Sequence, residues 1–169
     1  MRRIGSQRWT RSAILNLVAL AATCCGRAAI ASATSTRPCT ASMIHAALLP
    51  PGRYTATYAT NVYLYETEAV ELTNTSAGGC YLSQPTLMDV SVPSGLLSVA
   101  DLYLAPSHVN VPSATSATLK FGALVGCATF QAPIWASSVT VTFPHVGNLR
   151  LGGLHMGLPC GAPQLLSFQ

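Results

Sequence analysis

Charged side chains are scarce in this chain of 169 residues, because Asp, Glu, Lys and Arg together make up only 8% of it. Five of the nine basic residues precede residue 28. From residue 34 onward, four basic side chains stand against five acidic ones, a net charge of −1. Binding of nucleic acid requires clustered positive charge. We therefore expect no nucleic-acid partner.

The chain also lacks an apolar run of about 20 residues, the length needed to span a bilayer. Its main apolar stretch, Ala13–Cys25, follows four arginines and precedes the small-residue triplets Ala29-Ile30-Ala31 and Ala31-Ser32-Ala33. That order is typical of a secretory signal peptide. We predict a cleaved signal peptide over residues 1–33, a single domain over residues 34–169, and no stable membrane insertion after cleavage.

No Cys-x-x-Cys pair occurs, which argues against a zinc knuckle and a redox dithiol. Two of the six cysteines, Cys24 and Cys25, lie in the leader and leave lipid modification there as an alternative to cleavage. The other four form an even set, which in a short exported chain indicates disulfides and a secreted, extracellular or cell-envelope location. Three pairings are possible. We favour the one that joins sequence neighbours, Cys39–Cys80 and Cys127–Cys160.

Helical periodicity is weak, whereas alternation of apolar and polar residues recurs, as in Ala114–Phe121, Val139–Phe143 and Val70–Thr73. Groups such as Pro50-Pro51-Gly52 and Pro93-Ser94-Gly95 predict turns between strands. The pattern indicates an all-β fold, an antiparallel immunoglobulin-like β-sandwich of about 7–9 strands held by disulfides. Further strand candidates are Met43–Leu49, Arg53–Tyr65, Leu87–Val92, Leu96–Leu104, Leu149–Met156 and Leu165–Phe168.

Short motifs around the four cysteines resemble the secreted, mostly actinobacterial domain-of-unknown-function family 4232. The resemblance spans essentially all of residues 34–169 and implies an exported four-cysteine β-sandwich without an established activity. The matching residues are Cys39, Val70–Ser76, Cys80-Tyr81-Leu82, Pro85, Ala117–Phe121, Cys127, Val139-Thr140-Val141, Pro144 and Cys160.

Catalytic constellations are missing from the sequence. No serine lies in a Gly-x-Ser-x-Gly elbow, and five acidic residues leave little material for paired-carboxylate chemistry. Glu66 and Glu68 would share a strand face, but we interpret them as solvated acids near the end of a strand. We expect no enzyme activity and no cofactor.

Methionine and histidine together suit copper, especially Cu(I), and they occur as neighbours at two places. Met43 and His45 would lie on one strand face, whereas His155 and Met156 would point to opposite faces. These four residues are the candidate ligands of the alternative hypothesis, an exported copper-binding protein. Core packing of the methionines is the more ordinary interpretation.

Two further motifs concern the surface. Asn74-Thr75-Ser76 has the form of an N-glycosylation acceptor, but we interpret it as a turn in which Asn and Ser side chains bond to nearby backbone groups. Tyr54, Tyr58, Tyr63 and Tyr65 crowd one segment and could dock a partner. The sequence predicts a secreted, non-catalytic interaction module whose partner is an unidentified protein or a cell-wall component.

Overall fold

The computed structural model describes residues 37–58, 60–126 and 133–169. The predicted signal peptide, with Cys24 and Cys25, lies outside the described residues, as does Cys127. Ser32–Gln169 belongs to one compact unit. No helix among the described residues is long and apolar enough to cross a membrane.

Ten strands and two short 3-10 helices make up the described structure, and every pairing between named strands is antiparallel. The strands are β1 (Ile44–Tyr58), β2 (Asn61–Asn74), β3 (Cys80–Ser83), β4 (Leu87–Val92), β5 (Gly95–Ser98), β6 (His108–Val111), β7 (Ser116–Val125), β8 (Ile134–Phe143), β9 (Gly147–Leu158) and β10 (Gln164–Phe168). The 3-10 helices are η1 (Ala41–Met43) and η2 (Leu102–Leu104).

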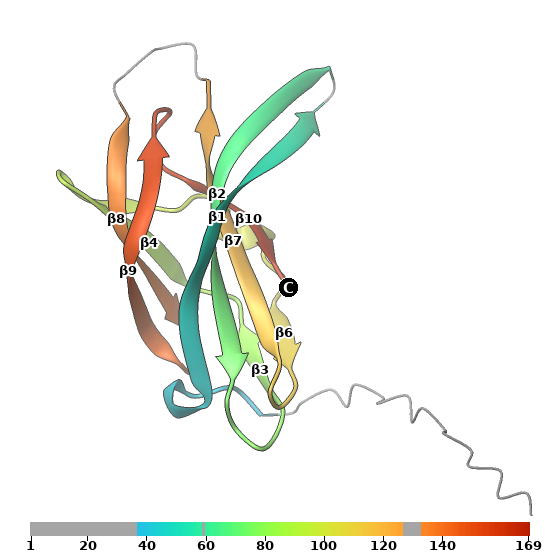
Figure 1. Ribbon diagram of the computed structural model, residues 1–169. Coiled ribbons are helices and arrows are strands. Elements are labelled where there is room, and N and C mark those ends of the chain that lie inside the picture. The colour runs from blue at the N-terminus through green and yellow to red at the C-terminus, as the bar shows by residue number, and fades with distance from the viewer. Residues whose placement is uncertain (1–36, 59, 127–132) are drawn as a thin grey trace, which may run out of the picture. The chain divides into compact units, whose positions relative to one another are not determined.

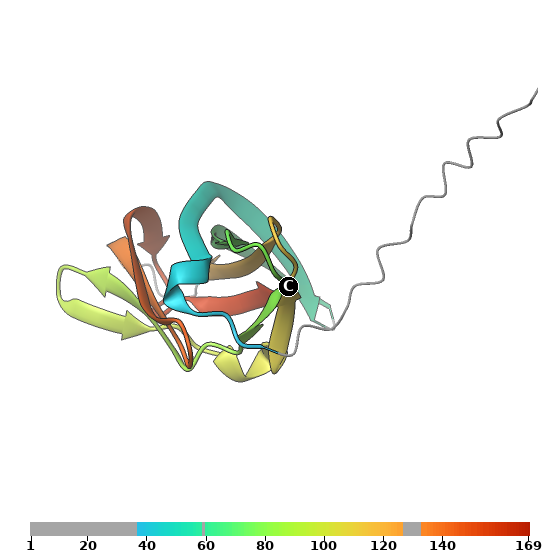
Figure 2. The same ribbon diagram turned by 90° about the horizontal axis from the view of Figure 1, so that it is seen from below.

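Two four-stranded sheets pack face to face, and a two-stranded sheet accompanies them (Figures 1 and 2). The strand orders are β1-β2-β7-β10 and β5-β4-β8-β9, with β3-β6 as the small sheet. Strands distant in sequence, β2 with β7 and β4 with β8, are paired, so the chain crosses between the sheets as it does in immunoglobulin-like sandwiches. The predicted β-sandwich fold is confirmed.

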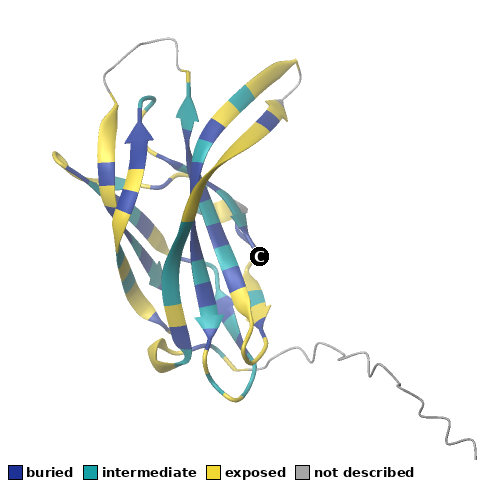
Figure 3. Cartoon of the chain, viewed as in Figure 1, coloured by how far each residue is buried: buried dark blue, intermediate teal, exposed yellow. Residues whose placement is uncertain are grey.

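The core lies between the two sheets, where apolar side chains from alternate positions meet. Figure 3 shows buried and exposed residues alternating along the strands, while exposed residues dominate the tip of the β1–β2 hairpin. This alternation follows from the two-residue period of a strand. The largest fully buried side chains are Phe121, Phe143, Leu72, Leu82, Met88, Leu119 and Met156.

Three sequence predictions about the strands are wrong. Pro50-Pro51-Gly52 is not a turn but part of β1, where the register with β2 shifts between Leu49 and Gly52. Arg53–Tyr65 is not one strand, because the chain reverses between Tyr58 and Asn61. Leu96–Leu104 is strand only as far as Ser98 and ends in η2. Proline is tolerated within β1 because β1 is an edge strand, whose outward positions need no N–H donor.

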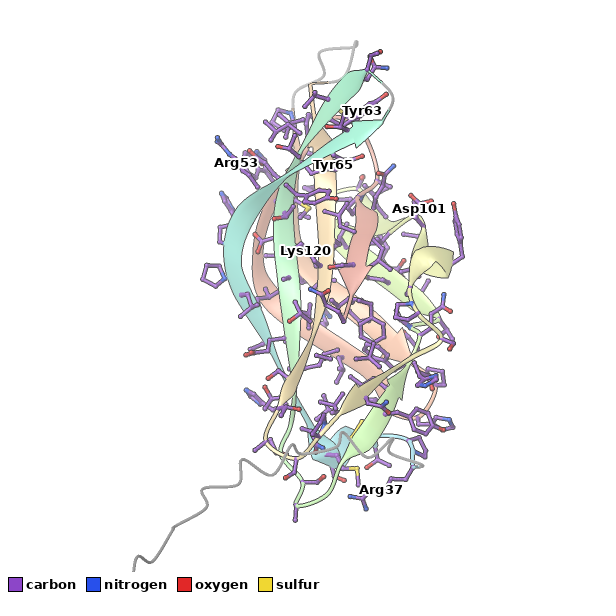
Figure 4. The ribbon with its side chains drawn as sticks, turned by 90° about the vertical axis from the view of Figure 1, so that its right-hand side faces the viewer. Arg37, Arg53, Tyr63, Tyr65, Asp101 and Lys120 are labelled. Carbon is purple, nitrogen blue, oxygen red and sulfur yellow. A yellow bond between two sulfur atoms is a disulfide. The ribbon has the colours of Figure 1, made fainter. Side chains whose placement is uncertain are left out.

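The disulfide Cys39–Cys80 is present, with an S–S distance of 2.08 Å, and both cysteines are buried. It fixes the segment before β1 against β3, where the Cys39 N–H donates to the Tyr81 carbonyl oxygen at 2.8 Å and the Tyr81 N–H donates to that of Arg37 at 3.0 Å. Figure 4 shows Arg37 close to this bridge. Cys160 is also disulfide-bonded, while the predicted pairing with Cys127 lies outside the described residues.

Asn74 is fully buried at the end of β2 and connects three parts of the chain. Its side-chain Nδ2 donates to the carbonyl oxygens of Gly78 and Val111, each at 2.9 Å, and its Oδ1 accepts the Ser76 backbone N–H at 2.9 Å and the Ser76 hydroxyl at 2.7 Å. The turn interpretation of Asn74-Thr75-Ser76 is confirmed. In the folded domain, Nδ2 is occupied and inaccessible to glycosylation.

Asn74→Ala should lower the free energy of unfolding by about 2–3 kcal/mol, because buried carbonyl and amide groups would lose their partners. Urea unfolding of the oxidised protein measures the change. Asn110→Ala is the matched control, since Asn110 is exposed on β6 and should change stability by less than about 0.5 kcal/mol. Equal effects of the two substitutions would contradict a structural role for the Asn74 side chain.

Candidate functional site

Two irregular strand segments face each other where the edge strands of the two sheets approach. In β1, the register shift places Pro50 and Pro51 opposite one residue of β2, Glu68. In β9, the register with β8 shifts between Ala136/Met156 and Ser138/Gly152, and Gly153 within the shift has a φ of +85°, which favours glycine. Bulges bend strands and leave backbone groups without ladder partners. The two sheet edges therefore do not join here.

A cleft of about 360 Å³ occupies this region. β1, β2, β8 and β9 all contribute to it, and its lining combines charged and aromatic side chains. The lining residues are Pro51, Gly52, Arg53, Glu66, Thr67, Glu68, Trp135, His155 and Met156.

Glu68 projects from β2 into the cleft, next to His155 of β9. It is only 6% exposed, and its carboxylate accepts a hydrogen bond from the His155 backbone N–H. Burial raises the pKa of the Glu68 carboxyl above its ordinary value of 4.5, while the nearby His155 imidazole and the hydrogen bond lower the pKa by less. The prediction that Glu68 is an exposed, solvated acid is wrong, because the β1 bulge and β9 cover it.

Trp135 and His155 form an aromatic pair beside Glu68. Their ring centroids are 4.6 Å apart and their planes are 20° from parallel, so the rings are stacked. The Trp135 ring also lies over Gly157, its partner in β9, where a Cβ atom would come within 3.6 Å of two ring carbons. Trp135 nevertheless stays 48% exposed, so the pair presents aromatic surface to solvent.

Arg53 and Glu66 complete the polar lining. They are cross-strand partners in the β1–β2 register, so both side chains project to one face of the hairpin. Glu66 and Glu68, two residues apart on β2, also share this face. Within the part of the chain that the structure describes, neither Arg53 nor Glu66 has a side-chain hydrogen bond or ion pair. Their hydrogen-bonding capacity is free for a ligand.

The tyrosines of the β1–β2 hairpin do not form a uniform docking face. Tyr65 is buried, and its hydroxyl donates to Gln164 Oε1 at 3.1 Å. Tyr54 packs against it with ring centroids 6.2 Å apart and is 43% exposed. Figure 4 shows Tyr63 and Tyr65 on one side of the hairpin and Arg53 on the other. The tyrosines with described side chains therefore stabilise the hairpin from the face opposite the cleft.

The four candidate copper ligands do not come together. Met43 belongs to η1 rather than to the strand that carries His45. His45 pairs with Thr73, whereas His155 contacts Glu68, which lies five residues earlier on β2 and is therefore about 17 Å away along the strand. Met156 is buried, while His155 is exposed. Among the described residues, no group of three His, Cys, Asp or Glu side chains could hold a metal ion. Copper binding by either pair alone stays a prediction.

Sequence reasoning placed Glu66 and Glu68 on one strand face and considered His155 apart from them, but it missed that all three share one cleft with Arg53 and Trp135. A signal was present in Pro50-Pro51-Gly52. Two adjacent prolines between alternating segments fit an interrupted edge strand as well as a turn. The missing information was which distant strand approaches that edge, which no local pattern specifies.

No family model, no curated protein and no solved structure matches the chain. The resemblance to domain-of-unknown-function family 4232 therefore stays a prediction.

Glu68→Gln should alter how stability depends on pH. Because the folded-state pKa of Glu68 is raised, the native protein stabilises the protonated carboxyl, and its contribution is lost as the pH rises through the folded pKa. The free energy of unfolding of the native protein, relative to that of Glu68→Gln, should therefore fall as the pH rises above about 4.5. Urea unfolding between about pH 4 and 8 measures the difference.

The control is Glu71→Gln, which removes a carboxylate from the same strand outside the cleft. A pH-independent difference between native protein and Glu68→Gln would show that Glu68 is not buried in the folded protein as described.

Proposed function

We propose that this chain is an exported, non-catalytic β-sandwich that binds an extracellular or cell-envelope partner, and that it belongs to domain-of-unknown-function family 4232. The observation that carries the binding role is the cleft beside Trp135. It combines a half-exposed tryptophan with charged side chains that lack protein partners, and aromatic and arginine side chains are enriched at binding hot spots.

Export is supported by the covalent structure. A buried disulfide that joins the first described segment to β3 is typical of proteins from oxidising compartments and uncommon in the cytosol. The N-terminal pattern of arginines, apolar residues and small residues adds an independent reason, because it has the order of a signal peptide.

The non-catalytic role is supported by the state of Glu68. A general acid must reach the atom that it protonates. Glu68 is buried and accepts a backbone hydrogen bond, so its carboxylate acts as a structural acceptor between two strands. Glu66 is left as the more accessible carboxylate of the pair.

The experiment expresses the full chain in a bacterium and measures its intact mass in the exported fraction, with and without reduction. The expected protein begins near Ala33 or Thr34, and its mass rises by two hydrogens per disulfide on reduction. It should also sediment with insoluble cell-envelope material. A full-length mass in the cytoplasm would contradict export, and an exported protein that does not sediment with the envelope fraction would contradict a cell-envelope partner.

A further inference from the structure

We propose that the cleft between β1 and β9 binds a neutral saccharide, with Trp135 as the stacking platform and Glu66 and Arg53 as the groups that bond to sugar hydroxyls. This inference deepens the proposed function and rests on it, because it names the chemical class of the extracellular partner.

The platform is the exposed part of the Trp135 ring. One face of a sugar ring presents C–H groups, which gain dispersion contacts when they lie on an aromatic surface. Trp135 is held in place by its stacking on His155 and its contact with Gly157, so little side-chain freedom is left to lose on binding. A fixed and half-exposed indole is preorganised for such a contact.

The polar groups match the hydroxyls of a sugar. The Glu66 carboxylate accepts hydrogen bonds through two oxygens, and the Arg53 guanidinium donates through a planar fork. The two residues are register partners on one face of the hairpin, and neither has another side-chain partner within the described structure. Neighbouring hydroxyls, each both donor and acceptor, can satisfy both groups together.

The charge around the cleft favours a neutral ligand. Arg53 is opposed by Glu66 on the partner strand, and Glu68 and His155 also line the cleft. An anionic polymer would meet these carboxylates, and a cationic ligand would meet Arg53. Residues 34–169 have a net charge of only −1, so the domain as a whole does not strongly attract anionic or cationic ligands.

The size and construction of the cleft favour a short saccharide segment. A volume of about 360 Å³ is near the lower end of the range of about 300–1,000 Å³ found for small-molecule sites. Pro50 and Pro51 lack backbone N–H groups, so the β1 side of the cleft offers fewer main-chain donors to an added peptide strand. The cleft is therefore better suited to bind a sugar through side chains than to pair with the backbone of an added peptide strand.

The experiment uses the exported, oxidised protein and its intrinsic fluorescence. Of the two tryptophans, Trp9 lies in the predicted leader, so Trp135 is the only tryptophan after residue 33 and reports directly on the cleft. The probes are soluble neutral oligosaccharides of glucose, N-acetylglucosamine, mannose and galactose, together with a set of extended peptides of mixed sequence. Expected is a saturable fluorescence change with at least one oligosaccharide and none with the peptides.

Variants locate the site. Glu66→Gln should weaken saccharide binding by about fivefold to tenfold through loss of a charge-assisted acceptor. Trp135→Ala, followed by calorimetry because the reporter is removed, should weaken it by at least about tenfold. Trp135→Phe keeps a smaller aromatic surface, so its affinity for the saccharide should lie between those of the native protein and Trp135→Ala. Tyr103→Ala is the matched control, since Tyr103 is 75% exposed on η2, outside the cleft.

Each result has one meaning. Binding that Trp135→Ala and Glu66→Gln weaken and Tyr103→Ala does not supports the inference. Equal weakening by Tyr103→Ala overturns the assignment to the cleft. An exported protein that sediments with the envelope fraction but binds no oligosaccharide, or binds only peptides, overturns the saccharide and leaves the interaction role standing. Failure of both sedimentation and binding overturns both proposals, and release of shorter sugars from the probes overturns the non-catalytic role.

Discussion

A hydrogen bond from the His155 backbone N–H to the buried Glu68 carboxylate is the contact on which the arrangement of the cleft depends. β1 and β9 are the edge strands of their sheets, and both are irregular where they approach one another. An unpaired N–H and an ionisable side chain would each be costly alone in this place. Together they satisfy each other, and they link β2 to β9 where the two sheets do not join.

The same irregularity determines which side chains face the cleft. Because β1 gains a residue between Leu49 and Gly52, Arg53 comes to share a face with Glu66, while Tyr54 moves to the opposite face beside the buried Tyr65. One face of the hairpin thus packs on its own sheet through tyrosines, and the other offers charged groups next to Trp135. The structural and recognition roles therefore lie on opposite faces of the hairpin, because successive side chains of a strand point to opposite sides.

Sequence reasoning predicted the part of this structure that depends on local pattern. Alternation located the sandwich and the strand Leu87–Val92 to the residue, and the preference for neighbouring cysteines predicted the Cys39–Cys80 bridge. It failed where long-range pairing outweighs local signals. Pro50-Pro51-Gly52 predicted a turn, yet pairing along β2 keeps it in one strand, and Glu68 looked solvated because β9, which covers it, is distant in sequence.

The most direct test of the central claim is an NMR measurement of the His155 backbone amide as a function of pH. If Glu68 accepts this hydrogen bond, the amide should resist hydrogen exchange although β9 is an edge strand, and its chemical shift should follow the titration of the Glu68 carboxyl and lose that dependence in Glu68→Gln. Rapid exchange of the His155 amide would contradict the account. So would a chemical shift of this amide that depends on pH in the same way in the native protein and in Glu68→Gln.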